Sequence, residues 1–219
     1  MDEIVVRLAR AIACLARLQL LSLLVRQGEL PPTRLAKELR LPLNVVSQHL
    51  RMLSSAGLLC RRKSGTWCYY RADSPYDATA ISGRLVRWLG DLFKDGIKAR
   101  LEHSGVHEVR NVAGTSDGDL HQQIYEAATA FTDLRRVQLL RQLDRQKSVS
   151  APDLITSLCL SPQALGRHMG KLMRRGYVRA ERRGHMLVYA LATTAQTPVH
   201  RRLFDLMKTA WAQPRFRTS

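Results

Sequence analysis

Two stretches of the chain carry polar side chains at a spacing that suits recognition of DNA bases. In "LPLNVVSQHLRML", residues 41–53, the apolar residues Val46, Leu50 and Leu53 are four and three positions apart and form one face of a helix. The opposite face carries Asn44, Ser47, Gln48 and Arg51. Asn and Gln pair with adenine in the major groove, and Arg pairs with guanine. The pattern predicts a base-reading helix; an ordinary solvated helix face is the alternative.

The second stretch, "SPQALGRHMGKLMRRGYV" at residues 161–178, repeats this pattern 119 positions later. Leu165, Met169 and Leu172 form its apolar face. Its outward positions are Gln163, Gly166, Arg167, Gly170 and Lys171. Two glycines inside a helix cost about 1 kcal/mol each relative to alanine. Close approach of the backbone to DNA or to another helix would offset that cost, and drift in a copy that no longer reads bases is the alternative.

His49 and His168 occupy the same position in the two stretches. A single histidine most often satisfies a local hydrogen bond. We therefore interpret both as structural or phosphate-contacting imidazoles, and not as metal ligands.

A cationic hairpin is predicted after each of these helices. "LLCRRKSGTWCYYRA" and "YVRAERRGHMLVYAL" alternate in polarity around a glycine-containing turn, at residues 64–65 and 183–184. Their basic residues are Arg61, Arg62 and Lys63 in the first hairpin and Arg179, Arg182 and Arg183 in the second. Such cations suit contact with phosphate or with the minor groove.

Cys60 and Cys68 flank the first turn and suggest a redox or soft-metal switch. A three-residue turn at 63–65 would place them opposite each other, whereas a two-residue turn at 64–65 would pair Cys60 with Tyr69. Opposed thiols beside Arg61 and Arg62 would favour thiolate chemistry. The alternative is that both are small apolar residues of the hairpin.

The elements that must position these groups also occur twice, because residues 15–70 match residues 134–189 without a gap. Each copy predicts a helix with leucines at helical spacing, as in "RLQLLSLLVRQ" and "RRVQLLRQLDRQ", and then a short helix, "ELPPTRLAKELR" or "SVSAPDLITSLC". The base-reading helix follows; Ser161 and Pro162 form a cap and a first turn, and Gly57 and Gly176 end it in a left-handed conformation. The fold class is therefore mainly α with small β-hairpins, as two tandem winged helix-turn-helix domains.

Longer helices flank each copy, near residues 5–16, 81–97, 120–131 and 199–211. Thr197 and Pro198 form the cap and first turn of the last one. Residues 103–118 are rich in small and polar side chains and predict a linker. We therefore expect domains at residues 1–102 and 119–219.

The first copy resembles the ArsR family of bacterial winged-helix repressors over roughly its first 100 residues. The resemblance lies in "LARAIACLARLQLLSLL", in the Val46 to Leu58 segment with Ser47, His49 and Gly57, and in "GTWCYYR". The second copy resembles the family less closely and keeps His168, Leu172, Gly176 and Gly184.

The resemblance implies a dimer in which terminal helices pair and two reader helices meet a palindrome about one DNA turn apart. A fused tandem could act as a monomer with an internal pseudo-dimer, reading an asymmetric or imperfectly palindromic site; a homodimer of whole chains is the alternative. The Cys-x-Cys metal pair of many family members is absent, and Asp91 and Asp95 have no histidine at suitable spacing. His103 and His107 could hold one ion if helical, but we expect no metal.

Composition favours a partner rich in phosphate. The 219 residues contain 35 Lys and Arg against 18 Asp and Glu, a formal charge of +17. The sequence contains no apolar run of membrane-spanning length, and its four cysteines are too few for a disulfide scaffold. We expect a cytoplasmic, nucleoid-associated protein bound to double-stranded DNA, with no membrane contact.

Motifs of catalysis are absent from the sequence, including phosphate-binding glycine loops, H-E-x-x-H and G-x-S-x-G. We therefore expect a transcriptional repressor without cofactor or enzymatic activity. The alternative function is an architectural or scaffolding protein that binds DNA by charge, or binds another protein, without reading bases.

Overall fold

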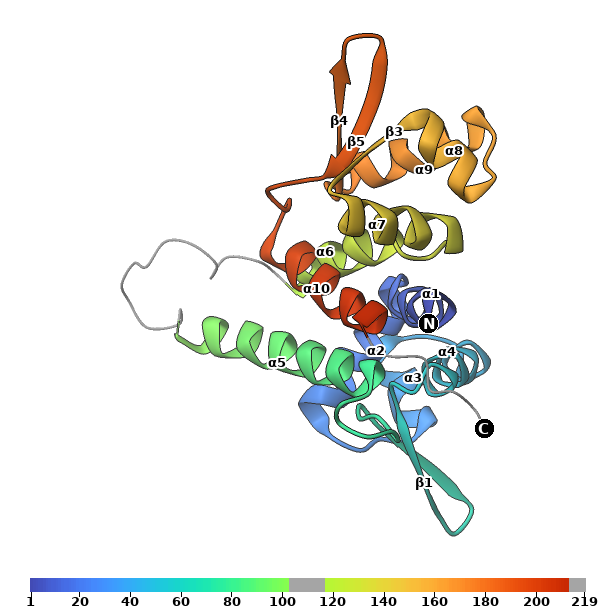
Figure 1. Ribbon diagram of the computed structural model, residues 1–219. Coiled ribbons are helices and arrows are strands. Elements are labelled where there is room, and N and C mark those ends of the chain that lie inside the picture. The colour runs from blue at the N-terminus through green and yellow to red at the C-terminus, as the bar shows by residue number, and fades with distance from the viewer. Residues whose placement is uncertain (103–116, 213–219) are drawn as a thin grey trace. The chain divides into compact units, whose positions relative to one another are not determined.

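The computed structural model describes residues 1–102 and 117–212, with side chains for 1–94 and 118–211 (Figure 1). The chain forms two compact units, one of residues 11–125 and one of residues 1–10 together with residues 126–219. Both are mainly helical with small antiparallel hairpins.

The unit of residues 11–125 places a hairpin after three helices. It contains α2 (Leu15–Gln27), α3 (Pro32–Leu39), α4 (Leu43–Ser55), β1 (Cys60–Ser64), β2 (Trp67–Arg71) and α5 (Ile81–Glu102), with the end of α1 (Asp2–Ile12) and the start of α6 (Asp117–Thr129). Its core includes Leu20, Leu35, Leu50 and Leu53, whose exposed fraction is 0%. The leucine periodicity therefore predicted the buried faces correctly.

The other unit has the same order of elements with one strand more. It contains α7 (Leu134–Gln146), β3 (Ser148–Ser150), α8 (Ala151–Leu158), α9 (Pro162–Arg174), β4 (Val178–Arg183), β5 (Met186–Leu191) and α10 (Pro198–Ala212), with the rest of α1 and α6. Its sheet has the order β3-β5-β4.

The strand β3 was not predicted, because residues 148–159 were expected only as a short helix that starts at a serine or a proline. Val149 pairs with Tyr189 in β5, and the helix begins only at Ala151. The equivalent pair in the other unit, Leu30 and Tyr70, forms an isolated bridge with N–O distances of 3.0 and 2.9 Å. Pro31 follows it and is the N-cap residue of α3, so the extended segment ends there.

Side-chain caps start the helices of the second unit where the sequence predicted them. Ser161 Oγ accepts from the Ala164 amide at 3.2 Å, and Thr197 Oγ1 accepts from the His200 amide at 3.3 Å. The helix ends at Gly57 and Gly176 are also confirmed, with φ angles of +73° and +66°. These positions require a left-handed backbone that glycine adopts without strain.

The N-terminal helix is shorter than predicted. Residues 5–16 were expected as one helix, but α1 ends at Ile12 and α2 starts at Leu15, with a bend of 82° between them. Within the described residues, no single helix is long and apolar enough to cross a membrane, although this bent pair together has the length and composition.

A buried arginine holds the bend in place, and its counterpart makes the same contact in the other unit. Arg17 Nε donates to the Ala11 carbonyl at 2.6 Å, and Arg136 Nε donates to the Ala130 carbonyl at 2.9 Å. Both carbonyls lie at the C-terminal end of a helical segment, where the peptide dipoles favour a cation.

The predicted linker lies outside the described residues, except for its last two positions, which belong to α6. His103 and His107, the possible ion-binding pair, also lie outside them.

Candidate nucleic-acid interface

The face of α4 that was predicted to read bases is exposed. Asn44, Gln48 and Arg51 are exposed and Ser47 is half-buried, because Val46 and the two core leucines bury the opposite face. The turn before the helix is made possible by Arg40, whose φ angle of 52° is left-handed. Leu41 then closes the turn by donating its amide to the Ala36 carbonyl at 3.0 Å.

The corresponding face of α9 is exposed but carries fewer side chains. Gln163 and Arg167 are exposed, whereas Lys171 is half-buried. Burial, together with the neighbouring Arg175 and Arg136, lowers the pKa of Lys171. Cys159 supplies the left-handed turn, with a φ angle of 49°. The two turns are therefore built alike.

Gly166 and Gly170 face open space. A Cβ atom added at either position would meet no described atom within 4 Å. Packing against a described helix of the same unit therefore does not explain the two glycines. Close approach to DNA or to a helix outside this unit stays a prediction.

His49 and His168 are half-buried and lie near Arg17 and Arg136, respectively. Burial and the charge of Arg17 lower the pKa of His49, and its Nδ1 atom has no hydrogen-bond partner among the described residues. His168 Nδ1 lies 3.7 Å from Asp133 Oδ1; burial lowers its pKa, and the Asp133 charge opposes that shift. Neither Nδ1 atom thus makes the local hydrogen bond on which the structural interpretation rested, and the roles of both histidines stay predictions.

The first hairpin turns one residue later than predicted. Ser64 pairs with Trp67, so Gly65 and Thr66 form the turn, and Gly65 has a φ angle of +59°. Glycine at the first central position with positive φ is typical of the two-residue type II′ turn. The hairpin β4–β5 turns at Gly184 and His185 in the same way.

The corrected register contradicts the proposed thiol switch. Cys60 pairs with Arg71 and Cys68 pairs with Lys63, so the two cysteines are not opposite each other and lie on different faces of the hairpin. Burial and the nearby Asp73 raise the pKa of Cys60, which disfavours the thiolate.

Arg62 is already paired within the protein. Its guanidinium contacts the Glu29 carboxylate at 2.6 Å and lies 5.1 Å from the centre of the Tyr69 ring. Arg61 and Lys63 are exposed, and neither has an ion-pair partner among the described residues. Arg61 and Lys63 are therefore the cations of this hairpin that remain available for a phosphate group.

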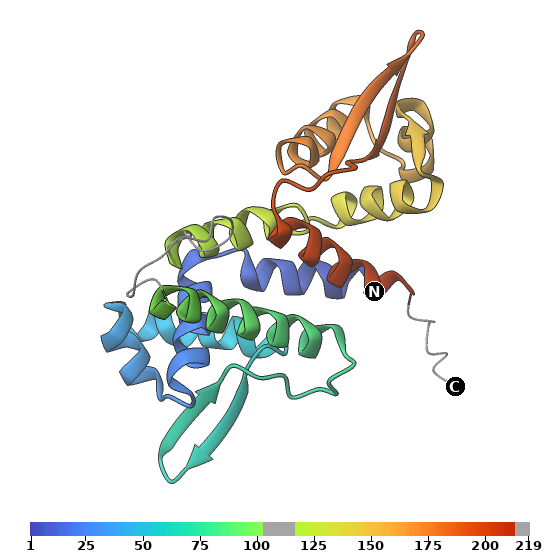
Figure 2. The same ribbon diagram turned by 90° about the vertical axis from the view of Figure 1, so that its left-hand side faces the viewer.

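The second hairpin carries three exposed arginines. Arg179 and Arg182 have no ion-pair partner in the described parts of the chain, whereas Arg183 lies 3.3 Å from Glu181 on the same strand. Each hairpin projects from the helices of its own unit, which leaves its tip accessible (Figure 1, Figure 2).

Residues that the sequence analysis missed form a shallow groove between α3 and β2. It is lined by Pro31, Thr33, Arg34, Lys37, Trp67 and Tyr69. Trp67 is 55% exposed at the base of the turn. Two features of the sequence could have indicated this groove. Trp67 directly follows the glycine-containing turn, and Arg34 and Lys37 are three positions apart on α3.

Metal-binding groups do not gather in the described residues, where no three His, Cys, Asp or Glu side chains lie together at a suitable distance. Asp91 is exposed on α5, and the side chain of Asp95 is outside the described set.

Comparisons with known proteins include a family model, two relatives and a solved structure. Residues 16–61 match the family model described as a helix-turn-helix domain. The chain is 41% identical over 92 residues to the arsenic resistance transcriptional regulator ArsR1 of Pseudomonas putida, which covers 41% of this chain and 65% of that protein.

It is also 39% identical over 54 residues to the uncharacterized HTH-type transcriptional regulator MJ1325 of Methanocaldococcus jannaschii, covering 25% of this chain and 61% of that protein. The chain thus spans less than two thirds of either relative.

The chain is also similar to a solved structure, the homodimeric winged helix-turn-helix domain Mb0332 of Mycobacterium bovis, which is a possible ArsR-family regulator. The two are 33% identical, the match covers 48% of this chain and 89% of that chain, and the TM-score is 0.35.

The matched residues coincide with the elements that carry the exposed polar face. Residues 16–61 extend from α2 through α3 and α4 into β1, and β2 completes the hairpin. Residues 16–61 therefore form a helix-turn-helix domain that continues into a hairpin, and the chain is similar in part to the regulator ArsR1.

Proposed function

We propose that the chain is a sequence-specific regulator that binds double-stranded DNA and represses transcription. The observation that carries the proposal is the exposed face of α4, with Asn44, Gln48 and Arg51, beside the free hairpin cations Arg61 and Lys63. The helix face offers groups that discriminate bases, and the cations offer phosphate contacts that set the register.

We further propose that residues 1–102 and 119–219 are two such domains in tandem. The support is the repetition of element order, of the two left-handed turns at Arg40 and Cys159, and of the type II′ hairpins. In this proposal Gln163, Arg167 and Lys171 of α9, with Arg179 and Arg182, form the second DNA-binding surface.

An internal pseudo-dimer would present both surfaces to one DNA site. Its support is the composition of the units, since residues 1–10 of α1 pack in the unit of residues 126–219. There Asp2 contacts Arg141 at 3.2 Å. The start of α6 packs in the other unit, where the rings of His121 and Phe93 are 5.4 Å apart. The two unlike reader helices would then favour an asymmetric or imperfectly palindromic site.

The test is selection from a random DNA pool at physiological salt, followed by sequencing of the bound fraction. We expect one motif with two unlike half-sites. A perfect palindrome would contradict the internal pseudo-dimer and indicate two paired chains. Salt-sensitive binding without any motif would contradict base reading.

A second candidate function, architectural binding by charge, is favoured by one observation. Gly166 and Gly170 leave the middle of the α9 surface without side chains, while the chain as a whole carries +17. Affinities for the selected motif and for unrelated DNA, measured over a range of salt, separate the two functions. Binding by charge alone would give the same affinity for the selected motif and for unrelated DNA, and that affinity would fall steeply with salt.

A further inference from the structure

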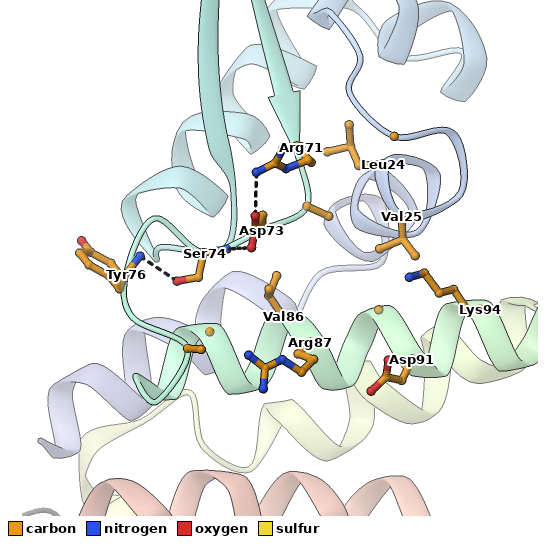
Figure 3. Close-up of a pocket in the computed structure, with 15 residues that line it drawn as sticks. Leu24, Val25, Arg71, Asp73, Ser74, Tyr76, Val86, Arg87, Asp91 and Lys94 are labelled. Atoms are coloured by element: carbon orange, nitrogen blue, oxygen red, sulfur yellow. Dashed lines mark hydrogen bonds and ion pairs between the residues drawn. The ribbon is translucent and has the colours of Figure 1, made fainter.

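A cavity of about 370 Å³ opens in the unit of residues 11–125, apart from the exposed face of α4. It lies between the C-terminal end of α2, the segment after β2 and the N-terminal part of α5, residues 83–94 (Figure 3). Its apolar lining comes from Leu24, Val25 and Val86, and its charged lining comes from Arg71, Asp73, Arg87, Asp91 and Lys94.

The other unit has a cavity at the matching place, but it is smaller, about 200 Å³. The buried Leu85 and Leu89 of α5 correspond to Leu203 and Met207 of α10, so Gly90 corresponds to Lys208. There Lys208 Nζ contacts Asp144 Oδ1 at 2.6 Å and joins two walls of the cavity.

The first unit lacks this ion pair, because the equivalents of Asp144 and Lys208 are Val25 and Gly90. Glycine inside a helix costs about 1 kcal/mol relative to alanine. Packing does not require Gly90, since an added Cβ would meet no described atom within 4 Å. At Gly83, by contrast, the Cβ would lie 2.9 Å from the Asp77 carbonyl oxygen. The missing side chain at residue 90 therefore keeps the cavity open.

Only some of the charged side chains at the cavity form ion pairs with other described residues. Arg71 contacts Asp73 at 2.8 Å, as the dashed line in Figure 3 shows. Arg87 and Lys94 both line the cavity from α5 and have no ion-pair partner among the described residues. Asp91 lies between them along the helix, which leaves one net positive charge on this wall.

We propose that this cavity binds a small organic monocarboxylate with an apolar body. The carboxylate would contact Arg87 and Lys94, and the body would lie against Leu24, Val25 and Val86. A volume of several hundred Å³ with an apolar wall and few converging polar groups is typical of sites for small molecules. A single net positive charge suits a monoanion better than phosphate.

The experiment is a titration of the full chain with benzoate, followed by NMR of ¹³C-labelled methyl groups. We expect saturable shifts at Leu24, Val25 and Val86, and binding at least about tenfold weaker for benzamide, which has the same shape without the charge. Inorganic phosphate, a charge without an apolar body, should bind at least as weakly as benzamide. No saturable shift with benzoate, or equal binding of benzoate and benzamide, would overturn the proposal.

Matched variants use the second unit as the template. The double variant Val25→Asp/Gly90→Lys copies the closing ion pair and should abolish the benzoate shifts while leaving the fold intact by circular dichroism. Arg87→Gln should weaken binding about tenfold without closing the cavity, which keeps the test valid if the double variant does not fold. Benzoate binding that is unchanged in Arg87→Gln would overturn the assignment of the carboxylate contact.

The reverse exchange is the control. Asp144→Val/Lys208→Gly opens the cavity of the other unit, where Asp205 stands at the position of Arg87. We expect no new benzoate site there. The binding assay contains no DNA, so its outcome is independent of the regulatory function proposed above.

Discussion

The helices α4 and α9 have equivalent buried faces but different exposed ones. Leu50 and Met169 are both 0% exposed, and both helices follow a left-handed turn. On the outer face, Ser47 and Arg51 of α4 correspond to Gly166 and Gly170 of α9. The apolar positions preserve the fold, so the exposed positions are free to differ in what they recognise.

The largest expected effect tests whether the buried faces are equivalent. Leu50→Ala and Met169→Ala should each destabilise the protein by about 2–5 kcal/mol, because each leaves a cavity in a closed core. Denaturant unfolding followed by circular dichroism measures both. Leu43→Ala is the control, since Leu43 is 47% exposed. A cost below about 1 kcal/mol for Met169→Ala would show that the core behind α9 is looser than that behind α4.

The next effect concerns the exposed faces. Replacing both Gln48 and Arg51 by alanine should weaken binding to the selected DNA motif by about 1–3 kcal/mol for each lost base contact, and Arg167→Ala should remove one such contact. Fluorescence anisotropy with the selected motif and with unrelated DNA gives the values. Arg202→Ala, which removes an exposed charge on α10, is the control. Equal losses on both DNAs would mean that α4 contacts only phosphates.

A smaller effect tests the glycines of α9. Gly166→Ala and Gly170→Ala should each stabilise the protein by up to about 1 kcal/mol, since neither new methyl group meets another atom. The denaturation midpoint reports this gain, with Ala164→Gly as the opposite control. If DNA affinity is unchanged in the double variant, the helix backbone does not approach DNA closely at these positions.

The smallest effect concerns the pH dependence of the two histidines. Burial lowers the pKa of both His49 and His168 in the folded protein, so the unfolded chain takes up protons first as the pH falls. Stability is therefore full above the unfolded pKa of about 6.5 and is lost as the pH falls from there through the lower folded pKa. His49→Gln and His168→Gln should each reduce the loss of stability between pH 7.5 and 5.5, as measured by urea unfolding at both values. A loss that is unchanged in one of the variants would show that its histidine does not contribute to the pH dependence.

Local patterns predicted most of the fold. Leucine spacing identified the buried faces, and Ser161, Thr197, Gly57 and Gly176 marked helix starts and ends, because caps depend on neighbours within a few residues. The hairpin turns were misplaced by one residue, since a glycine can occupy either central position of a two-residue turn. A turn displaced by one residue changes the partner of every residue in the two strands, including the partners of Cys60 and Cys68.

Local sequence patterns could not predict contacts between residues that are far apart in the sequence. The strand β3 depends on Tyr189, which is 40 positions from its partner Val149. The pairing of Arg62 with Glu29 joins residues 33 positions apart and removes one cation from the predicted interface. The cavity likewise depends on residues distant in the sequence, since Val25 and Gly90 line it 65 positions apart.

The contacts of Arg17 and Arg136 have a consequence for which substitutions the two units tolerate. Each guanidinium donates to a main-chain carbonyl, at Ala11 or Ala130, and every amino acid supplies that acceptor. A substitution at Ala11 or Ala130 therefore leaves the acceptor atom in place, whereas a substitution of the arginine removes the donor. These two arginines are thus less replaceable than the residues whose carbonyls they contact.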